Sequence, residues 1–375
     1  MAVHLVGLPH TPFDENAAST CAYTAKSVRL AKMLASVGEE VIVYWGGSKT
    51  RAQKGPWEYV PALTNAQQKK YFGDFSQQVL PVANFDAGEE YWQKMNDRVI
   101  KEISKRIQPG DFVALVAGHT QQTVANAFFA QAIVIEPEVG YSGIMTQGTF
   151  ACFESYAWMH NVYGMAGIED GRYYDTVIPN FQTPSDFEIG EDEGYALYLG
   201  RMVTRKGIQE AAQMAGKAGV PIIMAGAGAT QVAPGVVESL DGVRIEGDHV
   251  TYVGAVDPPE RKRLLSHARV LLAPTRYIEP FGTVHIEAMM SGVPVIAPDY
   301  GVFTETIING GNGWRIRMER DGVQAIQAAE ILRKNSESIR HYAIENFGVD
   351  VCAIRYKEWL DRLRTLWTPE GWYAP

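Results

Sequence analysis

The stretch Arg269–Ala297, R-V-L-L-A-P-T-R-Y-I-E-P-F-G-T-V-H-I-E-A-M-M-S-G-V-P-V-I-A, decides the fold of this chain. Its apolar run Val270–Ala273 ends at a proline and predicts a buried parallel strand. A helix is expected over Thr283–Ser291, closed by a glycine and a proline, and a second strand over Val293–Ala297. Strand, loop, helix and strand in this order indicate one unit of an α/β fold.

The junction between the loop and this helix carries the chemistry. The first amides of a helix lack intrahelical acceptors and carry the positive end of its dipole. They predict a phosphate site built from backbone, where a glycine leaves room for close approach. Glu279 precedes the site and Glu287 lies one turn inside the helix, where carboxylates can accept hydrogen bonds from sugar hydroxyls. The candidate amides belong to Phe281, Gly282, Thr283 and Val284.

The two acids and the residues between them resemble a known signature. Two solvated glutamates at a helix end would be the simpler interpretation, but a Pro-Phe-Gly corner separates them. Glu279–Gly282, the seven-residue gap and Glu287 resemble the E-x7-E motif of the retaining glycosyltransferases of family 4, which have the GT-B fold. Gly292–Ala297 and Glu305–Gly313 continue the pattern, so the resemblance covers the C-terminal half of the chain.

The resemblance implies a role for each matching residue. In the family a G-R-x4-K-G segment grips the donor diphosphate, and Arg201 and Lys206 are the matching residues. Glu287 is implied to hold the ribose hydroxyls and Glu279 the hydroxyls of the sugar. A diphosphate leaving group gains negative charge as the glycosidic bond breaks, so two cations and a helix N-terminus stabilise the transition state more than the ground state.

Two further sites come from the same resemblance. Val253 and Gly254 end the predicted strand Val250–Gly254, near which backbone holds the nucleobase in the family. His119 follows the predicted strand Phe112–Val116, at the sheet edge where α/β proteins bind ligands. His119 matches a histidine that contacts the transferred sugar in the family, and a histidine that caps a loop is the alternative.

Composition narrows the class of protein. The chain has 375 residues, of which 46% are hydrophobic and 21% charged, a globular balance with enough length for two domains. A net charge of −9 excludes a strongly basic whole-protein footprint for nucleic acid. No signal peptide, membrane span or metal-ligand spacing is expected, and three separated cysteines favour reduced thiols in a cytoplasmic protein: Cys21, Cys152 and Cys352.

In two regions the hydrophobic residues follow neither the helical nor the strand period. Gly46–Asn96 is rich in Gln, Lys and aromatic residues, and we expect irregular structure that covers the sheet, with an insertion that shapes the acceptor site as the alternative. Tyr141–Tyr174 is unusually aromatic, and we expect mostly core around a helix over Cys152–Val162, with some rings free to stack on an acceptor.

Together these patterns predict an α/β protein with the GT-B fold, in which two Rossmann-like domains face an interdomain cleft. A polar stretch over Gln182–Gly194 marks the boundary. We expect an acceptor-binding domain over 1–182 and a nucleotide-sugar-binding domain over 183–350. The remaining segment, 351–375, is expected to pack its helix back on the first domain.

The predicted reaction is metal-independent transfer of a sugar, with retention of configuration, from a nucleotide sugar to a hydroxyl group. A UDP-sugar is the expected donor, no cofactor is expected beyond it, and a homodimer is allowed. The acceptor stays open among a glycan, a lipid-linked sugar, a small molecule and a hydroxymethylated DNA base. A GT-B sugar-nucleotide epimerase and a non-catalytic nucleotide-sugar binding module are the alternatives. The candidate catalytic residues are Glu279, His119, Arg201 and Lys206.

Overall fold

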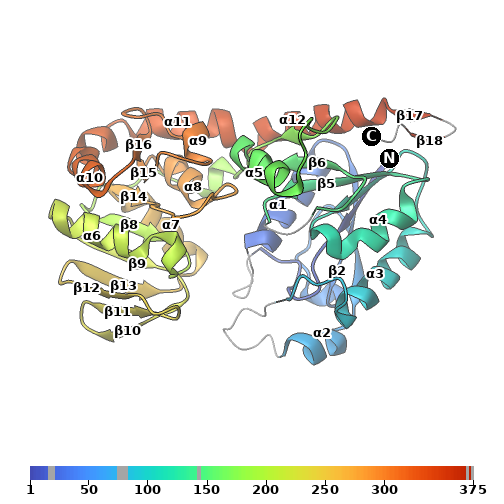
Figure 1. Ribbon diagram of the computed structural model, residues 1–375, viewed down its shortest axis with the longest axis horizontal. Helices are drawn as coiled ribbons and strands as arrows, with labels where there is room; N and C mark the ends of the chain where they lie inside the picture. The colour runs from blue at the N-terminus through green and yellow to red at the C-terminus, as the bar shows by residue number, and fades with distance from the viewer. Residues whose placement is uncertain (16–21, 74–82, 142–144, 369–370, 373–375) are drawn as a thin grey trace. The chain divides into compact units, whose positions relative to one another are not determined.

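The computed structural model describes residues 1–15, 22–73, 83–141, 145–368 and 371–372. The chain divides into two compact units, each built around its own parallel sheet (Figure 1). Unit 1 comprises Met1–Glu154, Met159–Ile178 and Cys352–Pro375. Unit 2 comprises Ser155–Trp158 and Pro179–Val351. The chain therefore enters unit 2 at Ser155 and again at Pro179, and its last segment belongs to unit 1.

A seven-stranded parallel sheet, in the order β3-β2-β1-β4-β5-β6-β7, forms the centre of unit 1. Most of its strands are buried along their whole length, as parallel strands covered on both faces must be. The strands are β1 Ala2–Val6, β2 Glu40–Gly46, β3 Glu58–Leu63, β4 Phe112–Leu115, β5 Ile133–Val139, β6 Phe150–Phe153 and β7 Thr176–Val177. The helices are α1 Ala22–Ser36, α2 Asn65–Phe72, α3 Glu90–Ile103, α4 Gln122–Phe128, α5 Tyr156–Ala166 and α12 Val349–Arg364. Beyond α12, β17 Trp367–Thr368 pairs with β18 Gly371–Trp372.

Two expectations for unit 1 are wrong. Within the stretch expected to be irregular, β3 adds a parallel edge strand to β2, and α2 begins with a capping box between Thr64 and Gln67. Cys152 does not open a helix, because the run Phe150–Phe153 is fully apolar and pairs with β5 as a buried strand. The helix α5 begins instead at Tyr156.

Unit 2 contains two sheets. A six-stranded parallel sheet has the order β13-β9-β8-β14-β15-β16, and a small antiparallel sheet has the order β10-β11-β12. The strands are β8 Ala196–Leu199, β9 Ile222–Ala225, β10 Ala229–Ala233, β11 Val236–Ser239, β12 Arg244–Glu246, β13 Val250–Gly254, β14 Val270–Leu272, β15 Val295–Pro298 and β16 Gly313–Ile316. The helices are α6 Ile208–Ala218, α7 Pro258–His267, α8 Val284–Met290, α9 Phe303–Thr306, α10 Glu319–Arg333 and α11 Ser336–Phe347.

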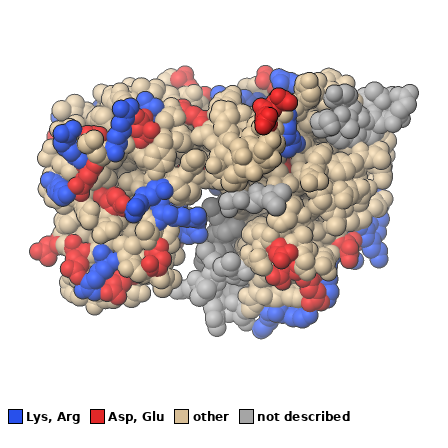
Figure 2. Space-filling view, viewed as in Figure 1, with Lys and Arg blue, Asp and Glu red and all other residues tan. Residues whose placement is uncertain are grey.

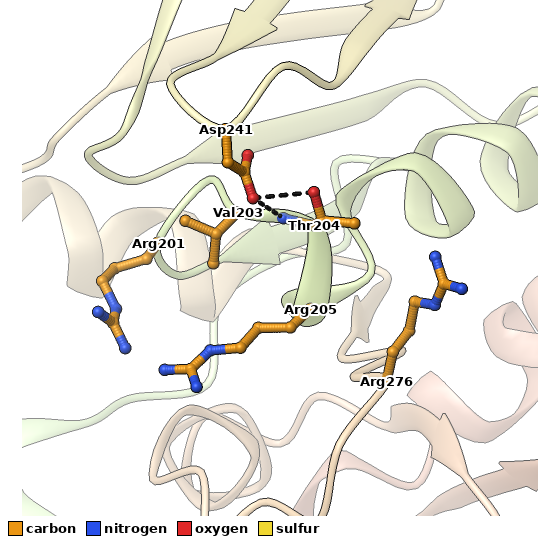
Figure 3. Close-up of a pocket in the computed structure, with 6 residues that line it drawn as sticks. All are labelled: Arg201, Val203, Thr204, Arg205, Asp241 and Arg276. Carbon is orange, nitrogen blue, oxygen red and sulfur yellow. Dashed lines mark hydrogen bonds between the residues drawn. The ribbon is translucent and has the colours of Figure 1, made fainter.

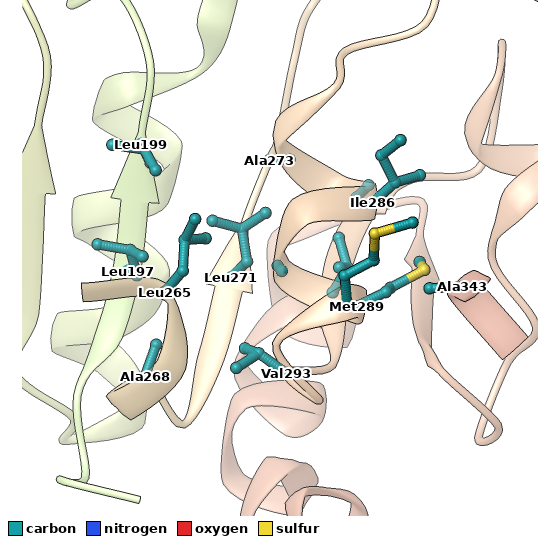
Figure 4. Packing of buried hydrophobic residues seen from close by; sticks show 14 of the residues in the cluster. Leu197, Leu199, Leu265, Ala268, Leu271, Ala273, Ile286, Met289, Val293 and Ala343 are labelled. Atoms are coloured by element: carbon teal, nitrogen blue, oxygen red, sulfur yellow. The ribbon is translucent and has the colours of Figure 1, made fainter. Parts of the chain in front are cut away.

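An apolar core fixes the corner between β14 and α8. Leu197 and Leu271 from the sheet pack in one cluster with Ile286 and Met289 of α8 (Figure 4). All four side chains are fully buried. Each such burial contributes about 1.5–3 kcal/mol relative to an exposed side chain, so the helix that begins near Gly282 is held rigidly on the sheet.

Candidate functional site

A partly buried ion pair lies at the carboxyl ends of two neighbouring strands of unit 2. Lys206 ends the short 3-10 helix η4, Thr204–Lys206, which follows β8, and Glu279 lies in the loop after β14. The Lys206 Nζ donates to both carboxylate oxygens of Glu279, at 2.8 and 2.6 Å. Glu279 is only 7% exposed. A carboxylate has about four acceptor positions, so Glu279 can accept sugar hydroxyls beside the lysine.

The Tyr277 ring makes cation–π contacts with Lys206 of this pair and with the neighbouring Arg205. The Arg205 guanidinium lies 4.8 Å from the centre of the Tyr277 ring, and the Lys206 Nζ lies 5.3 Å from it. Burial, followed by the nearby Glu279 carboxylate, raises the pKa of the Tyr277 hydroxyl, which therefore stays neutral at physiological pH. The ring serves as a platform for two positive charges.

Two glycines are required by the backbone of the site. Gly207, directly after η4, has φ +74°, and a Cβ there would stand 1.9 Å from the Pro274 carbonyl oxygen. Gly282 also has φ +74°, and a Cβ there would stand 2.8 Å from Cγ of Glu279. Only glycine meets both the left-handed conformation and the close approach. Both loops can therefore come close to the ion pair.

The start of α8 lies where the sequence predicts it. The helix covers Val284–Met290, one residue inside the predicted span at each end. Within the described chain no acceptor is found for the amide groups of Gly282, Thr283 and Val284, as is usual for the first turn of a helix.

A histidine that the sequence did not indicate lies behind this turn. His285 is fully buried, and its Nδ1 donates to the Gly282 carbonyl at 2.6 Å. Burial lowers the pKa of His285 to about 4, so the ring is neutral at physiological pH and holds the Gly282 turn without adding charge. A polar residue inside an apolar helix gives no sequence signal for such a role.

The second acid of the motif already has two side-chain partners. One carboxylate oxygen of Glu287 accepts from Nε2 of Gln182 at 2.9 Å, and the other pairs with the guanidinium of Arg261 from α7. Glu287 is 8% exposed. Neither partner was foreseen, because Arg261 lies in a helix of mixed charge with no distinguishing pattern.

An arginine-lined pocket of about 530 Å³ opens beside η4 (Figure 3). The predicted Arg201 lines it, together with Arg205 and Arg276, which no sequence motif indicated. The guanidinium groups of Arg201 and Arg205 lie toward the same side, and that of Arg276 points away from them (Figure 3). Arg276 pairs with Glu210 at 3.3 Å. The pocket is suited to an anion such as a diphosphate.

The other predicted residues lie on other elements. Val253 and Gly254 end β13, where Val253 is 41% exposed and the Gly254 carbonyl accepts from the Gly226 amide at 2.7 Å. His119 lies in unit 1, partly buried in the 3-10 helix Gly118–Gln121 that follows β4. Unit 2 thus contains every predicted site residue except His119.

Charges of both signs are interspersed over the face of the molecule in Figure 2. The described part of that face therefore lacks the wide basic surface typical of nucleic-acid binders. Among the described residues no group of three His, Cys, Asp or Glu side chains could hold a metal ion, and no helix is long and apolar enough to span a membrane. Cys152 and Cys352 are buried free thiols, and Cys21 lies outside the described residues.

Comparisons with known proteins find a glycosyltransferase family model that matches part of unit 2. Residues 181–346 match the model of the family described as glycosyl transferases group 1. The spore coat protein SA of Bacillus subtilis is 32% identical over 111 residues, 28% of this chain and 29% of that protein. An uncharacterized glycosyltransferase of Methanocaldococcus jannaschii is 32% identical over 172 residues, 44% of this chain and 41% of that protein. The chain thus spans less than half the length of these two curated relatives.

The whole chain has the fold of solved structures. The Anabaena protein HepE, solved in complex with UDP-glucose, superposes with a TM-score of 0.63 at 15% identity, covering 97% of this chain and 100% of that one. At this identity the likeness concerns the fold alone. It confirms the predicted α/β class with two Rossmann-like sheets of the GT-B type.

Proposed function

We propose that this chain is a retaining glycosyltransferase, because residues 181–346 match the model of the family described as glycosyl transferases group 1. It moves a sugar from a nucleotide sugar to a hydroxyl group of an acceptor. The observation that carries the proposal is the Lys206–Glu279 pair, at 2.6 Å, beside a pocket lined by Arg201 and Arg205. A buried carboxylate suits sugar hydroxyls and the cations suit a diphosphate.

The donor in this proposal is a UDP-sugar. The HepE structure with UDP-glucose supports a uridine nucleotide in a protein of the same fold. Arg201, Arg205 and Lys206 face the diphosphate, Glu279 binds the sugar, and Glu287 binds the ribose. Val253 and Gly254 lie near the nucleobase. The amides of Phe281, Gly282 and Thr283 complete the phosphate contacts.

The chemical step needs charge stabilisation more than a nucleophile on the protein. The bond between the anomeric carbon and the diphosphate oxygen breaks, and its electron pair leaves with the diphosphate. The acceptor oxygen bonds to the anomeric carbon on the same face, and its proton passes to the leaving phosphate. Arg201 and Lys206 stabilise the negative charge that develops, so the reaction is expected to resist EDTA. Neither Glu279 nor Glu287 is a covalent nucleophile in this proposal.

The acceptor belongs to unit 1 in this proposal, and His119 is the residue of that unit proposed to contact the transferred sugar. In this proposal the domain over 1–182 binds the acceptor and the domain over 183–350 binds the nucleotide sugar. The segment 351–375 packs on the first of them. Glycans, lipid-linked sugars and small molecules remain the candidate acceptors. The net charge of −9 and the mixed charges in Figure 2 weigh against DNA carrying a hydroxymethylated base.

The test is UDP release from UDP-, GDP- and ADP-sugars, with and without EDTA, in the presence of pooled acceptors. We expect release that depends on one donor and one acceptor and that survives EDTA. Lys206→Ala and Glu279→Ala should each lower turnover about 10²- to 10⁴-fold, the effect of removing a preorganised charge contact. Lys217→Ala, an exposed lysine of α6 paired with Glu319, is the matched control.

Other outcomes would contradict the proposal. Near-native turnover in both site variants would place the site elsewhere. A new epimer of the sugar formed without any acceptor would identify an epimerase. Tight UDP binding with no turnover on any pair would favour a binding module.

A further inference from the structure

A carboxylate from outside the cationic loop of the site accepts two hydrogen bonds from it. Asp241 lies in the turn between β11 and β12, 37 residues from Thr204 along the chain. Its Oδ2 accepts from the backbone N–H of Thr204 at 2.7 Å and from the hydroxyl of the same residue at 2.8 Å. Both bonds are drawn in Figure 3. Thr204 begins η4, the turn that carries Arg205 and Lys206.

The carboxylate is itself held in place. The hydroxyl of Ser239 donates to Oδ1 of Asp241 at 2.6 Å, and the same hydroxyl accepts from the Val243 amide at 2.9 Å. These bonds, first from Ser239 and then from Thr204, lower the pKa of Asp241 to about 2. Asp241 is therefore an ionised acceptor whose oxygens have fixed partners.

The antiparallel sheet β10-β11-β12 anchors this turn to the main sheet of unit 2. The Leu240 amide donates to the Gly228 carbonyl at 2.8 Å, next to β10. The Tyr252 hydroxyl, from β13, donates to the carbonyls of Gly226 and Ala229 at 2.7 and 3.1 Å. Asp241 thus connects η4 to a turn that is itself hydrogen-bonded to the rest of unit 2.

We propose that Asp241 is a positioning residue for the donor. Resting on the proposed function, we assign to the β11–β12 turn the task of fixing η4 so that Arg205 faces the pocket that Arg201 also lines. Asp241 itself lines that pocket. It is a negative charge in a site proposed for a diphosphate, which is unfavourable for the ligand. In this proposal the two hydrogen bonds to Thr204 outweigh that repulsion.

These two effects have opposite signs, which makes the proposal testable. Asp241→Ala removes both the charge and the bonds to Thr204. Asp241→Asn removes the charge, but its amide oxygen can still accept from Thr204 and its NH₂ group can donate to Ser239. If Asp241 acts by position, the Ala variant binds UDP more weakly and the Asn variant binds it equally or more tightly. If Asp241 acts only by charge, both variants bind UDP more tightly.

The experiment is calorimetric titration of UDP into the full chain and its variants at two salt concentrations. We expect Asp241→Ala to weaken UDP binding about three- to tenfold, the effect of losing hydrogen bonds that fix the loop. Asp248→Ala and Asp248→Asn, at an exposed acid after β12, are the matched controls and should leave UDP binding unchanged. Unchanged or tighter binding in Asp241→Ala, or equal weakening in both Asp241 variants, would overturn the inference.

A second measurement separates this inference from the proposed function. Hydrogen exchange of the segment 201–207, without nucleotide, should be faster in Asp241→Ala and unchanged in Asp241→Asn. Exchange that is unaffected in both variants contradicts the positioning role. If the exchange result is as expected but the wild-type chain binds no nucleotide, the proposed function fails, and with it the role in donor binding.

Discussion

Most acids of the candidate site have cationic partners, and this shapes how a ligand would enter. Glu279 pairs with Lys206, and Glu287 pairs with Arg261. Burying a charge without a partner costs several kcal/mol, so these acids are partnered wherever the loops bring a cation close. A bound donor must therefore hydrogen-bond to these carboxylates while their ion pairs with Lys206 and Arg261 stay formed. The positions of the loops, and so of their glycines, therefore matter as much as the charges.

Gly207→Ala should destabilise unit 2 and weaken UDP binding. A Cβ at this position meets the Pro274 carbonyl oxygen at 1.9 Å, in a conformation with φ +74°. Gly219→Ala is the matched control, because Gly219 has φ +72° with nothing within 4 Å of the added carbon. We expect a loss of about 1–3 kcal/mol for Gly207→Ala beyond that of the control, measured by urea unfolding. Equal losses in both would mean that the conformation alone, not the clash, limits this position.

Glu138 makes the stability of unit 1 depend on pH. It is 2% exposed in β5, where Ser27 donates to it and the charges of Lys26, Glu154 and Arg29 act on it. Burial, only partly offset by Lys26, raises its pKa from 4.5 to about 7. Between these values the unfolded chain loses this proton while the folded chain keeps it, so stability falls as pH rises from about 4.5 to about 7 and levels off above.

The measurement is urea unfolding between pH 4.5 and 8. Glu138→Gln should remove a fall on the order of 1–3 kcal/mol in the free energy of unfolding over that window. Glu40→Gln, at an exposed position of β2, should keep it. A Glu138→Gln profile that matches the wild type would show that another group causes the slope.

At the scale of elements, the regular segments could be predicted and the irregular ones could not. The strand, helix and strand over Arg269–Ala297 were predicted to within two residues at each end, because apolar runs with glycine and proline stops mark them. The sheet β10-β11-β12 was not foreseen, because its strands are three to five residues long, largely exposed, and defined by pairing with one another. Arg201 and Lys206 could be proposed from a motif, whereas Asp241 could not, because its contact with Thr204 depends on the position of this sheet.

Two side chains of α12, the last long helix, donate hydrogen bonds to backbone carbonyls of unit 1. Within unit 1, the Tyr356 hydroxyl of α12 donates to the Pro137 carbonyl at 2.6 Å, and the Trp359 indole donates to the Tyr174 carbonyl at 2.8 Å. Tyr356→Phe should cost about 1–3 kcal/mol in urea unfolding, because it removes the hydroxyl that satisfies a buried carbonyl. Tyr173→Phe, at a side chain that is 71% exposed, should be neutral. An equal effect of both would mean that α12 is not held by this bond.

At the scale of the whole molecule, each unit has its own parallel sheet. If unit 2 binds the donor, UDP should protect unit 2 and leave unit 1 largely unchanged. At about 100 times the Kd, a ligand stabilises the state it binds by about 2.7 kcal/mol. Hydrogen exchange followed by mass spectrometry should show slower exchange over 201–207 and 279–287, with β1 and β2 as internal controls. Protection confined to unit 1 would contradict the assignment of the donor site.

The path of the chain also sets an order of assembly. Unit 1 is made of three separate stretches, and the last of them, from Cys352 onward, follows the whole of unit 2. A ribosome makes the chain from its N-terminus, so unit 2 is synthesised in full before unit 1 can receive α12. The usual order, in which the N-terminal domain matures first, is thus reversed for the final step. Until Tyr356 and Trp359 emerge, the nascent unit 1 carries an uncovered surface that chaperones would recognise.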